Sequence, residues 1–288
     1  MANILSGLAS LGLGNLENAD LYEKEEVKKP AAKPQQEAAA PKEHNEIEYV
    51  FGKSHSCPVC YNDFKAPTVR QSKLRGKGAD TDLRPKFAGV DPLKYDVIVC
   101  PKCGYAALGR FFDTITPPQA KLVKEGISKS FRPISKPKEV YTYDEAFTNY
   151  QLALGNAVVK KGRASEKAYL CLKMAWLLRG KMEAWDSGYE PYQGDSYSED
   201  VEDLRQDELE LLNNAVEGFL NARQSETFPM CGMDENTLDY IIAVSAMKLE
   251  KYDIVSQMLN SLLGKPGLNS RMKDMCLDLK DKLKEVGK

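Results

Sequence analysis

Two pairs of cysteines carry the clearest chemistry in the sequence. Cys57 and Cys60 belong to a C-P-V-C pair, and Cys100 and Cys103 belong to a C-P-K-C pair that follows after 39 intervening residues. Cysteines three positions apart in a tight turn direct two sulfurs to one side, and two such turns that meet enclose a tetrahedral metal ion. The spacing therefore predicts a site in which four thiolates hold one metal ion.

The ligand set predicts which kind of metal site this is. The protein supplies all four ligands, as in structural zinc sites, whereas catalytic zinc sites keep one position open for water. We expect zinc, with iron in a rubredoxin-like site as the less favoured alternative, because iron uses the same turns. A redox-active dithiol is less consistent with the sequence, since no βαβ pattern flanks either pair.

The residues after each second cysteine predict how the turns close. Such a turn needs one residue in the left-handed backbone conformation, which glycine adopts without strain and asparagine tolerates next best. Gly104 follows Cys103 directly, and Asn62 follows Cys60 after one residue. We therefore expect Gly104 and Asn62 to take the left-handed conformation.

The segment between the pairs is rich in cations and aromatic residues. We expect Arg70, Lys73 and Arg75 to lie on a strand and Lys77 on the loop that follows. Cations beside aromatic rings suit phosphate contact and base stacking, so one interpretation is a contact with nucleic acid or another anion. The alternative is a solvated strand face whose charge balances the thiolates and the acidic helical half of the chain. The chain's net charge of −2 is unlike that of a typical nucleic-acid binder.

That small net charge hides a strong asymmetry along the chain. Residues 1–46 carry −3, residues 47–140 carry +8 and residues 141–288 carry −7. This division excludes a uniformly basic nucleic-acid binder and a uniformly acidic disordered chain. We expect the basic and acidic parts to dock on each other, an arrangement that would use the basic residues internally.

The same three parts differ in their predicted secondary structure. Strands in one part and helices in another together indicate an α+β fold. Residues 47–140 contain short strand-like segments over 47–51, 68–74 and 95–99, and we expect a small zinc-ribbon-like β module. Residues 141–288 show the apolar spacing of helices, and we expect a helical hairpin domain.

The helical part begins with a T-x-x-E capping box at Thr142 and Glu145. We expect six helices: over about 142–158, from about 165, over 204–222, from 234, around 255–262 and around 272–283. Their short connections favour antiparallel hairpins of tetratricopeptide type, with an irregular bundle as the alternative.

Residues 1–46 have a different composition from the rest of the chain. Residues 23–46 consist mainly of Ala, Pro, Glu, Lys and Gln, so we expect a disordered segment that serves as a linker. The first 16 residues form either a docking peptide or a frayed terminus. No cation precedes Lys24 and no apolar run reaches the ~20 residues of a membrane helix, so we expect no secretory signal, no membrane span and a cytoplasmic location.

The remaining reactive residue types form no catalytic constellation. Cys171 and Cys276 lie on apolar helical stripes, and Cys231 precedes a helix start that could activate it but has no histidine downstream. We expect all three to be core residues. His55 is either an exposed loop residue or a donor to the metal site. With only two histidines in the chain, we expect no enzymatic activity.

The residues around the cysteine pairs resemble a known bacterial family. The segments YVFGKSHSCPVC and DLRPKFAGVDPLKYDVIVCPKCGYAALGRFF, followed by helices, are similar to the domain-of-unknown-function family 2225 from about residue 47 onward. The resemblance implies a zinc-ribbon-like module joined to tetratricopeptide-like helices in the bacterial cytoplasm. It implies Cys57, Cys60, Cys100 and Cys103 as the metal ligands and assigns no activity.

A closed metal site and helical hairpins together predict a metal-stabilised adaptor or scaffold. We expect a protein or peptide partner on a concave helical face, where Tyr150, Tyr169 and Trp176 either line the face or belong to the core. The alternative function is a nucleic-acid-associated regulator, whose contact residues would be Arg70, Lys73, Arg75 and Lys77.

Overall fold

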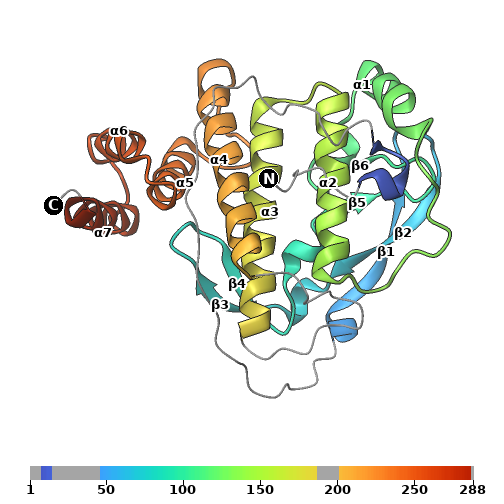
Figure 1. Ribbon diagram of the computed structural model, residues 1–288, viewed down its shortest axis with the longest axis horizontal. Coiled ribbons are helices and arrows are strands. Elements are labelled where there is room, and N and C mark those ends of the chain that lie inside the picture. The colour runs from blue at the N-terminus through green and yellow to red at the C-terminus, as the bar shows by residue number, and fades with distance from the viewer. Residues whose placement is uncertain (1–7, 15–45, 187–200, 287–288) are drawn as a thin grey trace.

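The computed structural model describes residues 8–14, 46–186 and 201–286. Within these ranges the chain forms three two-stranded antiparallel sheets and seven α-helices, so the prediction of an α+β fold is confirmed (Figure 1). None of the described helices combines the length and the hydropathy needed to cross a lipid bilayer.

The strands and helices occupy different halves of the chain. The strands pair in sequence order: β1 (Val50–Ser56) with β2 (Asp63–Val69), β3 (Arg75–Ala79) with β4 (Pro85–Ala88), and β5 (Val97–Val99) with β6 (Ala106–Leu108). The α-helices are α1 (Pro117–Val123), α2 (Tyr143–Val159), α3 (Ala164–Asp186), α4 (Val201–Ser225), α5 (Glu235–Lys248), α6 (Tyr252–Leu263) and α7 (Ser270–Val286). Helices α2 to α7 match the six predicted helices within a few residues.

Local capping explains where two of these helices begin. At α2, the backbone N–H of Glu145 donates to Thr142 Oγ1 at 3.1 Å, and the N–H of Thr142 donates to the Glu145 carboxylate at 3.0 Å. At α5, the N–H of Thr237 donates to the Asp234 carboxylate at 2.8 Å. Each side chain satisfies an N–H group that the first helical turn leaves without a partner, which is why these starts were readable.

One helix was missed in the sequence. Helix α1 starts after Thr116 with two prolines and continues into a π-helical turn over Lys124–Ser128. Proline suits the first turn of a helix because it lacks the N–H that would be unpaired there. The spacing of Thr116 and Gln119 is a capping box, and the Thr116 N–H donates to the Gln119 side chain at 3.1 Å. This capping box was the signal that could have revealed α1.

A single large hydrophobic core joins the strand region to the helices. Val97 and Leu108 from β5–β6, Leu154 from α2 and Leu172 from α3 belong to the same buried cluster. Figure 1 shows α2 and α3 side by side, with the β1–β2 and β5–β6 sheets beyond α2 and helix α4 beyond α3. The domain boundary after residue 140 stays a prediction, and the core runs across it.

This central position decides between the two predicted placements of the aromatic residues, while the concave binding face itself stays a prediction. The side chains of Tyr150 and Trp176 are 0% and 4% exposed, and the Tyr150 hydroxyl donates to the Leu93 carbonyl at 3.0 Å. Tyr169 is half-buried, with the Lys173 ammonium 5.0 Å from its ring centre. Because α2 and α3 are covered by other elements on both sides, these aromatic residues belong to the core, which was the alternative.

Part of the N-terminal segment also packs on the body of the protein. Leu13 is fully buried, and the Arg132 N–H donates to the Leu11 carbonyl at 3.1 Å. For residues 8–14 the prediction of a frayed terminus is therefore wrong, and the prediction that this segment docks on the protein's own body is correct. Glu46, placed in the linker by its composition, is 1% exposed and binds Lys94 Nζ at 2.6 Å. The rest of the predicted disordered segment lies outside the described residues.

A buried network of charges connects the β3–β4 hairpin to the helices. Arg179 of α3 lies at its centre, with its guanidinium 3.1 Å from Asp80, 2.8 Å from Asp82 and 2.6 Å from Glu208 of α4. Asp82 is fully buried and also accepts a hydrogen bond from the Trp176 indole N–H at 3.1 Å. Burial alone would raise the pKa of Asp80, but its hydrogen bonds and ion pairs with Lys86, Arg84 and Arg179 together lower it to about 2.

The network shows that the basic and acidic parts do pack together, but with mixed signs. Carboxylates of the basic part, such as Asp82, contact the cation Arg179 of α3. The cation Arg84 of the basic part contacts Glu183 of α3 at 2.5 Å. Within the described chain the four predicted contact cations form no ion pair with an α-helix, and Lys73 instead pairs with Glu48 at 3.7 Å. The prediction that docking would use these cations is therefore wrong, because other residues of both signs make the contact.

We predict that Asp82→Asn lowers the free energy of unfolding by about 2–4 kcal/mol, because the buried Arg179 guanidinium loses counter-charge. Asp281→Asn is the matched control, since its carboxylate is 70% exposed and pairs only with Lys284 on α7. The control should leave the unfolding free energy nearly unchanged. Urea unfolding followed by circular dichroism measures both, and equal effects would contradict the prediction.

Candidate metal centre

The two cysteine pairs fold into turns with the same hydrogen bonds. We call residues 57–62 knuckle 1 and residues 100–105 knuckle 2. In knuckle 1 the Cys57 N–H donates to the Asn62 carbonyl at 3.0 Å, and the Tyr61 N–H donates to the Cys57 carbonyl at 2.8 Å. In knuckle 2 the equivalent bonds join Cys100 to Tyr105 at 2.8 Å and Gly104 to Cys100 at 3.0 Å. The matched sequence spacing has therefore produced matched backbone geometry.

The residue that closes knuckle 1 differs from the prediction. Gly104 has φ +72° as expected, but in knuckle 1 the left-handed residue is Tyr61, with φ +57°, and not Asn62. The reason is geometric: the residue four positions after the first cysteine must turn its N–H back to that cysteine's carbonyl. The position in the turn decides the conformation, and the preference of asparagine does not.

The surroundings explain why only one knuckle needs glycine. A Cβ atom on Gly104 would lie 2.5 Å from the ring of Phe131, far inside van der Waals contact. Tyr61 meets no such obstacle, because its side chain is 79% exposed. A left-handed tyrosine still costs about 1–2 kcal/mol relative to its ordinary conformations.

The four sulfurs lie at distances that suit one metal ion. All four Sγ atoms are within 4.8 Å of one another, and the Cys57–Cys103 and Cys60–Cys100 pairs are each 3.6 Å apart. A tetrahedral ion with metal–sulfur bonds of about 2.3 Å places its sulfurs roughly 3.8 Å apart. The cluster can therefore hold a metal ion without rearrangement, and its geometry accommodates zinc and iron alike.

The electrostatics of the cluster also call for a cation. Hydrogen bonds from Cys103 and Cys57 stabilise the Cys100 thiolate and lower its pKa to about 2. The hydrogen bond to Cys100 raises the pKa of Cys57 to about 12, and that of Cys103 rises even further. Several thiolates in so small a volume repel one another, so a divalent ion is what allows all four to be deprotonated.

Knuckle 2 is attached directly to the helical part of the protein. The Asn156 side chain of α2 donates to the Gly104 carbonyl at 2.9 Å and to the Leu152 carbonyl at 2.9 Å. On the other side, the Ile134 N–H donates to the Pro101 carbonyl at 2.9 Å. A metal ion that fixes knuckle 2 therefore also fixes a contact with α2.

His55 lies close to the cluster but outside the ligand set. Its ring is half-buried on β1, with its centre 5.9 Å from that of Phe64 and 6.0 Å from that of Phe112. Burial lowers the pKa of His55, which favours the neutral ring. The exposed-loop interpretation is wrong, because the strand pairing places this side chain against two aromatic rings.

The other three cysteines are core residues, as predicted. Cys171 and Cys276 are fully buried, and the Cys231 thiol donates to the Ser165 carbonyl at 3.3 Å. Burial raises the pKa of Cys231 to about 12, so an activated thiol at this helix start is excluded.

The four predicted contact cations are all exposed, although their backbone differs from the prediction. Arg70 follows β2, Lys73 ends the 3-10 helix Gln71–Lys73, and Arg75 and Lys77 both lie on β3. The expected strand is interrupted because Lys73 N–H and Leu74 N–H donate to carbonyls three residues earlier and form a tight turn. The cations are therefore spread over β3 and the turn that precedes it.

We predict that the purified protein contains about one zinc ion per chain, measured by inductively coupled plasma mass spectrometry. Cys100→Ser should remove most of the metal, whereas Cys276→Ser should not, because Cys276 is buried on α7. Less than about 0.5 zinc or iron per wild-type chain would contradict the metal site.

A second prediction compares the two left-handed residues. Gly104→Ala should lower the unfolding free energy of the metal-loaded protein by about 2–3 kcal/mol, because the new Cβ meets Phe131. Tyr61→Gly should instead leave it unchanged or raise it by up to ~1 kcal/mol, because it removes backbone strain in open space. Urea unfolding measures both, and a larger loss from the Tyr61 change would show that the ring matters to the fold.

Comparison with known proteins agrees with the cysteine geometry in pointing to one family. The family model described as "uncharacterized protein conserved in bacteria (DUF2225)" matches residues 50–283, a range that includes both knuckles and nearly all of the helical part. Neither the curated proteins nor the solved structures include a match to this chain. Because the match covers most of its length, the chain belongs to the DUF2225 family.

Proposed function

We propose that the protein is a non-enzymatic adaptor, stabilised by zinc, that binds a protein or peptide partner. The observation that carries this proposal is the closed four-cysteine cluster whose second knuckle bonds to α2. A metal placed there has no open position for substrate, and it supports the junction between the ribbon strands and the helices. Its role is then to hold a binding scaffold in shape.

The chemistry of the remaining thiols supports a non-enzymatic role. Burial raises the pKa of Cys171 and of Cys231 to about 12 each, so both stay protonated at neutral pH. The thiols in the described chain are free, which fits a reducing compartment, and we place the protein in the cytoplasm.

The partner surface that we propose lies on the ribbon strands. We call Phe51, Arg70, Lys73 and Arg75 the basic face. The Arg70 guanidinium lies 5.1 Å from the ring centre of Phe51, and that ring is 39% exposed. Arginine stacked on an exposed aromatic ring is typical of interaction surfaces and suits acidic groups of a partner.

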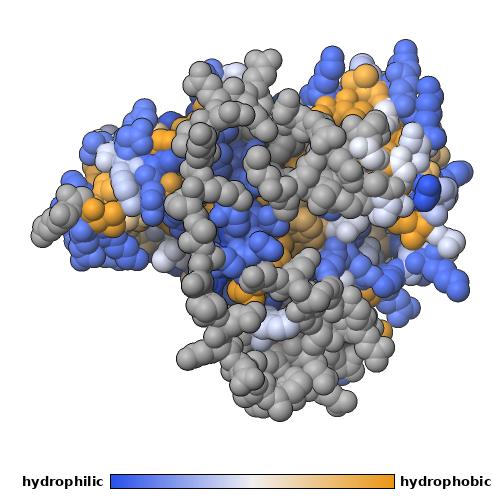
Figure 2. Space-filling model, viewed as in Figure 1, coloured by the Kyte–Doolittle hydropathy of each residue, from blue (hydrophilic) through white to orange (hydrophobic). Residues whose placement is uncertain are grey.

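The described part of the face in Figure 2 supports a charged partner over an apolar one. The face in Figure 2 is mainly hydrophilic where its residues are described, with apolar side chains in small separate areas. Exposed apolar residues scattered singly are usual for a protein surface and do not mark a docking site.

A second candidate function uses the same surface. Because the cations of the basic face do not pair with the α-helices, they remain accessible to phosphate groups. Exposed cations beside an aromatic ring favour a nucleic-acid contact, and the regulator alternative therefore stays open.

We predict that a variant with Arg70→Glu, Lys73→Glu and Arg75→Glu loses its partner in affinity capture from the native cell, because the reversed charges repel acidic groups. The matched control reverses three exposed cations on α7, Arg271, Lys273 and Lys282. The control should retain every partner that the wild-type protein captures. Capture is run with and without nuclease, and the eluates are compared by mass spectrometry.

The outcomes separate the two functions. Protein capture that survives nuclease and is lost only in the basic-face variant supports the adaptor. Loss of all specific capture on nuclease treatment, with binding that weakens steeply with salt, supports the nucleic-acid regulator instead. Equal capture by the basic-face variant and the control would contradict both.

A further inference from the structure

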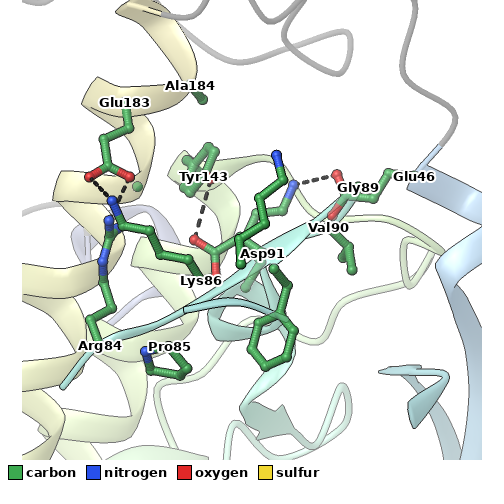
Figure 3. Close-up of a pocket in the computed structure, with 14 residues that line it drawn as sticks. Glu46, Arg84, Pro85, Lys86, Gly89, Val90, Asp91, Tyr143, Glu183 and Ala184 are labelled. Atoms are coloured by element: carbon green, nitrogen blue, oxygen red, sulfur yellow. Dashed lines mark hydrogen bonds and ion pairs between the residues drawn. The ribbon is translucent and has the colours of Figure 1, made fainter. Parts of the chain in front are cut away.

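A cavity of about 400 Å³ lies between the β3–β4 hairpin and the C-terminal half of α3. Figure 3 shows part of its wall: Arg84 just before β4, Lys86 from β4, Asp91 from the loop after it, Glu183 from α3 and Tyr143 from the start of α2. This volume lies within the range of small-molecule sites in proteins. Neither the metal centre nor the basic face contributes to the wall.

Most charges in the wall already have partners. Arg84 and Lys86 both bind Glu183, at 2.5 Å and 3.1 Å, and buried Lys94 binds buried Glu46 at 2.6 Å. These ion pairs are rigid. In each of them at least one side chain is immobilised by packing or by a second ion pair. A ligand would meet a preformed polar wall.

Lys77 and Asp91 retain binding capacity. Lys77 is exposed at the cavity and forms no ion pair with any residue that the structure describes. Asp91 accepts one hydrogen bond at each oxygen, from the Leu93 N–H at 3.0 Å and from the Tyr143 hydroxyl at 3.3 Å. A carboxylate has about four acceptor positions, so Asp91 can accept further donors.

Gly180 has no side chain, and this allows helix α3 to approach Asp91 closely. A Cβ atom at Gly180 would lie 2.6 Å from Asp91 Oδ2 and 3.2 Å from the Tyr143 ring. Figure 3 shows Asp91 and Tyr143 directed toward each other across this part of the cavity. The cavity thus presents a free cation and, in its wall, a carboxylate with spare acceptor positions.

We propose that this cavity binds a small amphoteric metabolite. Its phosphate or carboxylate group contacts Lys77, and its amino or hydroxyl group donates to Asp91. The proposal goes beyond the adaptor function and does not depend on it, because the basic face lies outside the cavity.

The test is isothermal titration calorimetry on the full-length, zinc-loaded protein. The probes are O-phosphoserine, which carries both kinds of group, serine, which lacks the phosphate, and inorganic phosphate, which lacks the amine. We expect saturable binding of O-phosphoserine that weakens roughly tenfold in Lys77→Gln and in Asp91→Asn, as loss of a hydrogen bond to a charged group predicts. Asparagine keeps the N-cap that Asp91 provides to the 3-10 helix Pro92–Tyr95.

The matched control is Lys65→Gln, an exposed cation on β2 that lies outside both the cavity wall and the basic face. It should bind O-phosphoserine as the wild-type protein does. Binding of serine as tight as that of O-phosphoserine, with the same loss in Lys77→Gln, supports the proposal and identifies the anionic group as a carboxylate.

Three results would overturn the proposal. The first is no saturable binding of any probe up to about 10 mM. The second is equal binding by Lys77→Gln and Lys65→Gln. The third is inorganic phosphate binding as tightly as O-phosphoserine, with no effect of Asp91→Asn. A thermal melt of each variant, which should match the wild-type protein, separates lost binding from lost folding. Since none of these changes touches Arg70 or Lys73, failure here leaves the adaptor proposal intact.

Discussion

Repulsion among four sulfurs is the constraint on which the rest of the structure depends. Cysteines that lie within 4.8 Å of one another can all be thiolates only when a cation lies between them. The backbone turns, the left-handed residues and the packing of Phe131 on Gly104 all serve to bring these sulfurs together. The hydrogen bond from Asn156 then links the ordered knuckle 2 to α2.

The second organising feature is the charge network around Arg179. It holds the β3–β4 hairpin on α3 and α4, and through Asp82 it reaches Lys248 of α5 at 3.9 Å. Buried ion pairs add little net stability, but removing one partner is costly, so they favour one arrangement of ribbon and helices over others. The basic face is left free because this network takes its cations and carboxylates from other positions.

Features of the structure could be predicted from the sequence when the residues that cause them are close together in the chain. The cysteine spacing, the capping box at Thr142 and the apolar stripes are local, and they predicted the knuckles and six helices well. The contact of Arg179 with Asp80 spans 99 residues, and no sequence pattern encodes such a pair. Tyr61 was missed for a different reason, because residue preference was weighed above position in the turn.

The 39 residues between the two cysteine pairs have their two ends brought together where the knuckles meet. A metal ion at the cluster closes them into a loop, and this loop contains Asp80, Asp82 and Arg84 of the network. Such closure reduces the entropy of the unfolded chain as a disulfide would, by about 4 kcal/mol for a loop of this length in the chain-entropy model. A metal bound at this cluster would thus be a cross-link that thiol reductants do not cleave and that chelators can remove.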